Sequence, residues 1–281
     1  MVALGITTPV LTRLPGGHGR WEREAGFDEV VQIAEAADRL GYDYLTCSEH
    51  VAVPAPVAEI RGAVYWDPLA TLGYIAARTT RIRLATSVLV LGYHHPLEIA
   101  KRYGTLDRVS GGRLVLGVGV GSLREEFELL GVPFEGRGER GDDALRALRA
   151  SLSTTTPAYD GPHYSYEDFI VDPCAVQPHV PIWIGGRTLR SLRRASVLAD
   201  GWMPFGLSVA QMGEMLERQP PPADVVLSPE RALDPVAAPQ RAGESIAELA
   251  GIGATIINAR LVSHSVAHYI EQLEALTTVA R

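Results

Sequence analysis

The residues best suited to chemistry follow directly after short apolar runs. Ser48, Glu49 and His50 come after one such run, and His94-His95 comes after the next. A histidine beside a carboxylate suits general acid–base work, because its charge changes near neutral pH. Glu49 and His50 with a further histidine would also fit a two-histidine, one-carboxylate metal site, and a structural His50 is a third interpretation. After the last two apolar runs the sequence offers only Glu230 and Asp234, which lie in a loop beyond the run and not at its end. We therefore expect no metal site.

Glycines follow two later apolar runs. Gly185 and Gly186 precede Arg187, Thr188 and a predicted helix. Glycines admit close approach of a ligand to the backbone, and N–H groups at a helix N-terminus bind phosphate. An ordinary strand-to-helix turn is the alternative. The G-x-G-x-G spacing of 117–121 departs from the dinucleotide fingerprint, and it indicates either backbone clearance or room for a flat ring.

Eight apolar runs alternate with segments of helical period, and this alternation must position those residues. The runs are Val2–Thr8, Tyr42–Cys47, Ile82–Leu91, Arg113–Val118, Pro181–Ile184, Gly201–Pro204, Asp224–Leu227 and Ala254–Ala259. Such alternation predicts a parallel sheet, and eight units at this length favour an α/β protein with a (β/α)8 TIM barrel and insertion loops. A doubly wound sheet is the rival, but the first run lacks its nucleotide fingerprint. No linker divides the chain, so we expect one domain over 1–281.

Several helix ends carry local signals. Asp67-Pro68 predicts an N-cap and a first helical residue, and Gly41 fits the end of the preceding helix. Ser122 and Glu125 have the spacing of a capping box. The segment 153–179 has no clear period, and a loop of that length is usually functional or mobile.

Composition excludes several partners. The chain has 26 Lys and Arg against 33 Asp and Glu, a net charge of −7, which argues against nucleic-acid and anionic-membrane surfaces. Two cysteines cannot build a disulfide framework and fit a reducing compartment. No apolar run is long enough to span a membrane, and the N-terminus lacks the basic region of a signal peptide. We expect a cytoplasmic protein.

The longer motifs resemble the bacterial-luciferase-like superfamily. Two stretches carry the resemblance most strongly, Thr86–Lys101 and Thr105–Gly121, and three shorter ones support it: Arg124–Phe127, Glu135–Arg140 and Pro181–Gly186. Ser48-Glu49-His50 fits the acidic-histidine pair of that family. The resemblance covers nearly the whole chain and is closest to the branch of F420-dependent oxidoreductases.

This resemblance implies a TIM barrel that binds the deazaflavin F420 or reduced FMN at its mouth, and a homodimer. It implies a non-proline cis peptide at Ser87-Val88, pressing on the cofactor ring. The residues that it assigns to the cofactor are Ser48, Thr86, Ser87, Val88, Gly119, Gly121, Ser122, Gly185, Gly186, Arg187 and Thr188. His50 would handle a proton, with Glu49 contacting it or the ring. Ser122 stands where the sugar-phosphate dehydrogenase branch has an acidic proton donor.

Three functions follow as hypotheses. The first is hydride transfer between F420 and a small organic substrate, and its sister is monooxygenation with reduced FMN and O₂. The second class is a barrel that binds flavin without catalysis, motivated by Ser122. A metal hydrolase is the third. The variable segment 159–179 takes the place of a loop that commonly covers substrate, and its aromatic residues suggest an apolar or aromatic substrate.

Overall fold

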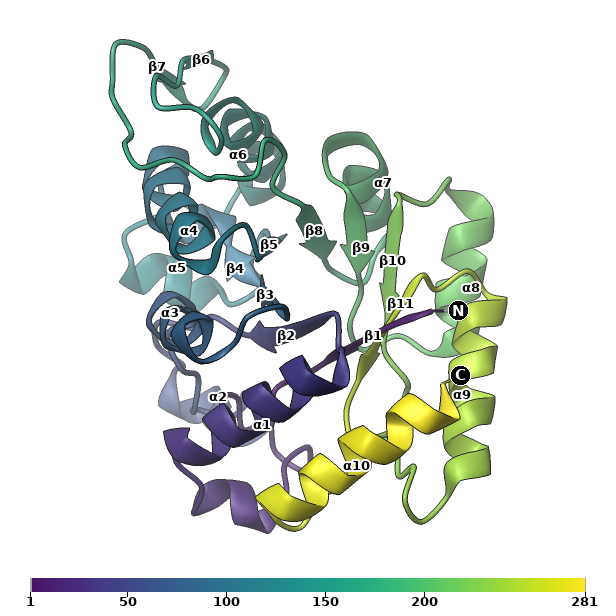
Figure 1. The fold of residues 1–281 in the computed structure, drawn as a ribbon. Helices are drawn as coiled ribbons and strands as arrows, with labels where there is room; N and C mark the ends of the chain where they lie inside the picture. Colours follow the sequence, from purple (N-terminus) through teal and green to yellow (C-terminus); the bar gives the residue numbers. More distant parts are fainter. Residues whose placement is uncertain (1, 281) are drawn as a thin grey trace.

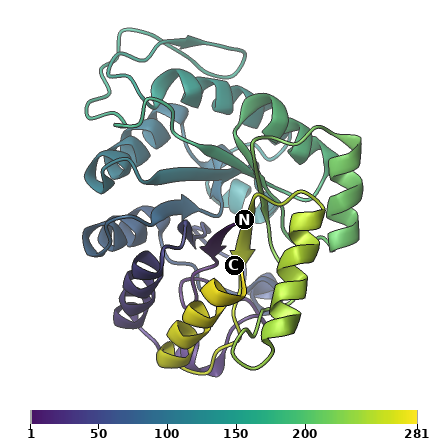
Figure 2. The same ribbon diagram turned by 45° about the vertical axis from the view of Figure 1, so that its right-hand side comes forward.

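Each of the eight apolar runs forms a strand in the computed structural model, which describes residues 2–280. The strands are β1 (Ala3–Ile6), β2 (Tyr44–Cys47), β3 (Arg83–Thr86), β5 (Leu114–Gly119), β8 (Ile182–Gly185), β9 (Gly201–Met203), β10 (Asp224–Leu227) and β11 (Ile256–Ala259). They pair in parallel in the order β3-β2-β1-β11-β10-β9-β8-β5, and pairing of β3 with β5 closes the barrel. The predicted (β/α)8 barrel is confirmed, with helices around the strands (Figures 1 and 2).

Helices follow the strands as expected. They are α1 (Phe27–Leu40), α2 (Ala55–Arg61), α3 (Pro68–Arg78), α4 (Pro96–Ser110), α5 (Arg124–Leu129), α6 (Arg137–Ser151), α7 (Leu189–Leu198), α8 (Val209–Arg218), α9 (Pro239–Gly251) and α10 (Val266–Val279). Asp67 caps α3 through a hydrogen bond from the Ala70 N–H group, as predicted. Gly41 ends α1 with φ +83°, also as predicted. The sequence did not indicate α2, because α2 buries no residue and so has no apolar period. None of the helices among residues 2–280 is long and apolar enough to cross a membrane.

The expected capping box at Ser122 does not form. Helix α5 begins at Arg124, its N-cap is Leu123, and no side chain caps it. The Ser122 hydroxyl oxygen instead accepts a hydrogen bond of 3.2 Å from Arg61, whose helix lies after β2. A tertiary contact therefore replaces the local one that the spacing predicted.

The third apolar run is interrupted. We expected one strand over 82–91, but the chain leaves β3 at a cis peptide bond between Ser87 and Val88. The short strand β4 (Leu89–Val90) then pairs with the end of β5, and a 3-10 helix follows at Leu91–Tyr93. The cis bond lies at the position that the resemblance implied.

The segment 153–179 starts at one end of the barrel and forms a hairpin that reaches the N-terminus of α4. It joins α6 to β8 and so begins and ends at the amino-terminal end of the barrel, with a short hairpin of β6 (Tyr159–Asp160) and β7 (Ser165–Tyr166). The hairpin lies along α6, where the Tyr159 hydroxyl group donates to Asp143 at 2.5 Å (Figure 1). The rings of Tyr164 and Tyr166 lie 5.4 Å and 5.9 Å from the ring of His95, which is the N-cap of α4, so the hairpin reaches the mouth end of that helix. The expectation that this segment covers substrate stays a prediction.

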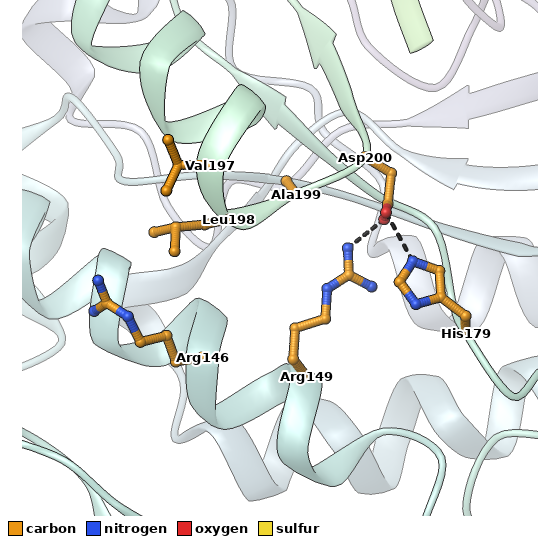
Figure 3. A pocket seen from close by; sticks show the side chains of 7 residues that line it. All are labelled: Arg146, Arg149, His179, Val197, Leu198, Ala199 and Asp200. Atoms are coloured by element: carbon orange, nitrogen blue, oxygen red, sulfur yellow. Dashed lines mark hydrogen bonds and ion pairs between the residues drawn. The ribbon is translucent and has the colours of Figure 1, made fainter. Parts of the chain in front are cut away.

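A polar cluster ties the amino-terminal ends of β8 and β9 together. Asp200 precedes β9 and accepts hydrogen bonds from the Ile182 N–H group, from His179 and from Arg149, which lies near the end of α6 (Figure 3). Burial alone would raise the pKa of Asp200, but these bonds outweigh burial and lower it. A cavity of about 410 Å³ adjoins the cluster. It lies at the end of the barrel opposite the loops that carry the predicted site.

Two apolar cores hold the barrel. One fills the space between the strands and the helices. The other fills the barrel itself with Tyr44, Ala85, Val115, Trp183, Met203, Val226 and Ile256. Because side chains alternate along a strand, residues two positions beyond these also face the barrel interior, nearer its mouth. This inner core is the floor on which a site at the mouth rests.

Candidate active site at the mouth of the barrel

The Ser87-Val88 peptide stands at the mouth, above the inner core. The Ser48 hydroxyl group donates to the Ser87 carbonyl oxygen at 2.8 Å and so ties the end of β2 to this peptide. Ser48, Ser87 and Val88 are each partly exposed. The structure therefore brings these three predicted residues together, on a surface that a bound molecule can reach.

Glycines on two strands make room for the Val88 side chain. A Cβ atom at Gly185 would lie 2.6 Å from Val88 Cγ1, and one at Gly119 would lie 2.9 Å from Val88 Cγ2. Real Cβ atoms do not approach that closely, so each glycine is required by Val88. The space that the missing side chains of Gly119 and Gly185 leave is filled by the side chain of Val88. The two glycines therefore shape the mouth by allowing Val88 to lie where it does.

We expect Gly185→Ala to lower the free energy of unfolding by about 1–3 kcal/mol, because the new methyl group must displace Val88 or the backbone. Gly73→Ala in α3 is the matched control, since nothing lies within 4 Å of its Cβ position. A glycine-to-alanine change inside a helix is expected to be neutral or to stabilise by up to about 1 kcal/mol. Urea unfolding measures both, and equal midpoints for Gly185→Ala and the unmodified chain would show that Val88 needs no such space.

His50 is paired with a carboxylate that the sequence did not single out for it. His50 Nδ1 lies 2.7 Å from Oε2 of Glu126, which belongs to α5 and is 1% exposed. The same oxygen accepts a hydrogen bond of 2.7 Å from the Tyr93 hydroxyl group. The other oxygen accepts from the N–H groups of Val51 and Ala52. Glu126 therefore fixes the loop after β2 as well as the imidazole ring.

The charge of Glu126 decides the proton arrangement on His50. Burial alone would raise the pKa of Glu126, but hydrogen bonds from His50, Tyr93 and the backbone outweigh burial and lower it. An ionised carboxylate only accepts hydrogen bonds, so His50 Nδ1 must donate. In the neutral ring, Nε2 is then the free acceptor, and it has no hydrogen-bond partner among residues 2–280. The His50 side chain is 18% exposed, so a molecule at the mouth can reach the ring.

Glu49 makes no hydrogen bond with His50, which was one of the two predicted contacts, and its contact with the cofactor ring stays a prediction. Its two oxygens accept hydrogen bonds from the Val90 N–H group at 2.6 Å and from His94 Nε2 at 2.7 Å. Burial alone would lower the pKa of His94, but the hydrogen bond and the charge of Glu49 outweigh burial and raise it. Glu49 is 9% exposed and is committed to holding the chain after the cis peptide.

Three further predicted residues, Thr86, Gly121 and Ser122, have different surroundings. Thr86 is fully buried and donates to the Gly117 carbonyl oxygen at 2.6 Å, which leaves it no surface for a ligand. It positions Ser87, which follows it. Gly121 has φ +78° and makes room for Phe127, since its Cβ would lie 2.5 Å from that ring. Ser122 is exposed at the rim, where it contacts Arg61.

The turn after β8 keeps the features that suit an anion. Gly186 has φ +138°, which favours glycine, and Arg187 is exposed. Thr188 caps α7, with its side chain accepting from the Ser191 N–H group. The N–H groups of Leu189 and Arg190 have no acceptor within the described part of the chain. This helix end can therefore receive a phosphate or carboxylate oxygen.

Sequence reasoning missed Glu126 and Tyr93 as site residues. Both were visible in the motifs that carried the resemblance, since Glu126 belongs to 124–127 and Tyr93 precedes the histidine pair. Nothing in their spacing joins them to His50, which is 76 positions from Glu126. No cluster of three metal-ligating side chains occurs within residues 2–280, and His50 and His94 bind different carboxylates.

Comparison with known proteins places this geometry in a family. Residues 7–219 match the family model of luciferase-like monooxygenases. An uncharacterised protein of Mycobacterium tuberculosis is 30% identical over 209 residues, which cover 70% of this chain and 72% of that protein. An F420-dependent secondary alcohol dehydrogenase in complex with an F420-acetone adduct has TM-score 0.77 and 13% identity, over 100% and 99% of the two chains.

A type II Baeyer-Villiger monooxygenase from Pseudomonas putida, in complex with FMN, has TM-score 0.74 and 16% identity, over 98% and 97% of the two chains. At these identities the two solved structures establish the shared fold, whereas the family model and the mycobacterial relative establish kinship in sequence. This chain therefore belongs to the luciferase-like monooxygenase family.

Proposed function

We propose that this chain is an oxidoreductase that binds F420 at the barrel mouth and transfers hydride to or from a small organic substrate. The observation that carries the proposal is the mouth itself. A partly exposed Ser87-Val88 platform, an anion-accepting helix end and a histidine with a free Nε2 all follow the carboxyl ends of the strands. Active sites of TIM barrels are built at that end.

The residues present fit a flat ring with an anionic tail. Ser87 and Val88 offer the platform for the ring, because glycines behind Val88 hold its side chain in place. Gly186, Arg187 and Thr188 would hold the phosphate end at the first turn of α7. F420, when bound, supplies the site that gives or accepts hydride, and the protein supplies orientation and exclusion of water.

His50 would manage the proton that accompanies hydride transfer. Its Nε2 accepts a proton from a substrate hydroxyl group when a carbonyl compound is formed, and donates one in the reverse direction. Glu126 is the positioning residue, because its negative charge fixes the Nδ1 proton and stabilises the imidazolium ion. The protein side of this chemistry needs no acid at Ser122.

The second candidate function is monooxygenation with reduced FMN and O₂. It is favoured by the family model, which is that of monooxygenases, and the same platform and helix end would hold FMN. A barrel that holds either cofactor without turnover is the third candidate, and the hydroxyl group at Ser122 is its only support. A homodimer remains part of the proposal because the family resemblance suggests one.

Parallel fluorescence titrations of the protein with F420 and with FMN test the proposal. We expect saturable 1:1 binding of F420 with much weaker binding of FMN. Tight binding of FMN alone would overturn hydride transfer to F420 and favour the monooxygenase, which oxygen consumption then checks. Failure of both cofactors to bind would remove the function and the cofactor assignments together. Tight binding without reaction over a broad substrate panel would favour the non-catalytic barrel.

A further inference from the structure

A polar cluster interrupts the apolar wall of the barrel near its mouth. Asn258 lies on β11, two positions beyond the inner-core residue Ile256, so it faces the barrel interior. Its Nδ2 group donates to Thr7 Oγ1 and to Ser228 Oγ, each at 3.1 Å. These two residues follow β1 and β10, which flank β11 in the sheet. The side chains therefore form one group across three adjacent strands.

The cluster is costly to stability. Asn258 is 7% exposed, and its Oδ1 atom is buried without a hydrogen-bond partner among residues 2–280. A buried unpaired carbonyl oxygen costs about 1–3 kcal/mol. Rotating the amide by 180° would leave two N–H donors in that place, so the orientation present is the better one. An apolar side chain would avoid this cost altogether, so stability does not account for an asparagine at this position.

The amide of Asn258 determines where the hydroxyl hydrogens of Thr7 and Ser228 can point. Because Nδ2 donates to both hydroxyl oxygens, neither hydroxyl hydrogen is directed at Asn258. No acceptor for either hydrogen lies within the described residues. Thr7 and Ser228 are partly exposed, whereas Asn258 is not. The amide therefore presents two hydroxyl donors to whatever occupies the mouth.

The cluster lies across the barrel from the Ser87-Val88 platform. In the closed sheet β11 is four strands from β5, counted either way, and β10 is four strands from β3. Gly119 of β5 adjoins Val88, and Ser87 follows β3. A molecule between the two walls would have the platform on one side and the two hydroxyl groups on the other.

Exposed apolar side chains follow two strands of this wall of the barrel. Phe205 follows β9 and is 56% exposed, and Val262 follows β11 and is 43% exposed. Strand β9 is the neighbour of β10, and β11 carries Asn258. Exposed apolar side chains beside a few convergent polar groups are typical of small-molecule sites.

We propose that Thr7 and Ser228, held by Asn258, bind an acceptor oxygen of the substrate, and that this substrate is an apolar molecule carrying a carbonyl or carboxylate group. The inference rests on the proposed function, because it places the substrate on the side of the mouth opposite the platform for the cofactor ring. Thr7 and Ser228 are specificity-determining residues, and Asn258 is a positioning residue that acts through them.

Acetophenone and ethylbenzene make a matched pair of probes, since ethylbenzene has a CH₂ group where acetophenone has its carbonyl group. Their dissociation constants are measured by ligand-observed NMR with the full chain, both free of cofactor and loaded with the cofactor that binds. We expect acetophenone to bind about tenfold more tightly than ethylbenzene, the effect of one to two neutral hydrogen bonds. In the double variant Thr7→Val, Ser228→Ala, we expect the ratio of the two dissociation constants to fall to about one. Thr277→Val on α10 is the control and leaves the ratio unchanged.

Asn258→Leu separates the functional role from a structural one. We expect this variant to keep or raise the midpoint of thermal unfolding and to lose the preference for acetophenone. Equal affinities of the two probes for the unmodified chain, or an unchanged ratio in the variants, would overturn the inference. If the unmodified chain binds no cofactor but still prefers acetophenone, the proposed function alone is overturned. The two outcomes are distinguishable because the ratio of probe affinities is also measured on the cofactor-free protein.

Discussion

Replacing His50 by alanine is expected to lower kcat by about 10²–10⁴-fold while the cofactor still binds. The change removes the only atom of the pair that a substrate can reach, His50 Nε2, because Glu126 is buried beneath it. The Ser87-Val88 platform and the turn before α7 do not involve His50 and remain in place. Stopped-flow measurement of cofactor oxidation or reduction gives kcat, and the fluorescence titration gives the dissociation constant of the cofactor.

His163→Ala is the control for this variant. His163 lies in the hairpin on the outside of α6, where its side chain is exposed and only its backbone N–H group bonds to Asp143. We expect it to leave kcat and cofactor affinity unchanged. Full turnover in His50→Ala would exclude His50 from the reaction. Loss of cofactor binding in the same variant would instead assign it to the cofactor site.

The second large effect is expected from Glu126→Gln, which we expect to lower kcat on the order of 100-fold. Glutamine keeps the shape, and its carbonyl oxygen still accepts from the N–H groups of Val51 and Ala52. Its NH₂ group then faces His50 Nδ1 in place of the second oxygen. A donor at that place stabilises the ring form with its proton on Nε2, which removes the free acceptor from the mouth.

A double-mutant cycle distinguishes this role from general destabilisation. If Glu126 acts through His50, Glu126→Gln costs nothing further once His50 is alanine, and the two losses are not additive. Glu125→Gln is the matched control, because Glu125 is adjacent in α5 but exposed. Additive losses, or an equal loss in Glu125→Gln, would contradict positioning by Glu126. Unchanged cofactor affinity in Glu126→Gln confirms that the mouth is still folded.

Much of the fold follows from local signals in the sequence. The β-branched and apolar runs become strands because they are buried on both faces, and the intervening period of 3.6 places one face of each helix against them. Asp67 and Gly41 mark helix ends because their side chain or backbone conformation satisfies groups that the helix leaves free. Residues after the strands could be nominated as site residues because parallel strands share one carboxyl-terminal end.

Local signals in the sequence could not predict which carboxylate binds which histidine. Glu49 adjoins His50 in the chain but binds His94, whereas Glu126 binds His50 from another loop. Successive residues at a strand end point in different directions, so adjacency gives no contact. The hairpin at 159–166 shows the same limit, since only the path of α6 reveals at which end of the barrel it begins.

The sequence by itself determined the barrel, the family and the strand ends at which a site can form. Only the tertiary structure decided which side chains meet there: His50 with Glu126, Val88 with its two glycines, and Asn258 with two hydroxyl groups. The reason is physical. Secondary structure depends on neighbours a few positions apart, whereas a site depends on the closure and register of the barrel, which bring together residues tens to hundreds of positions apart.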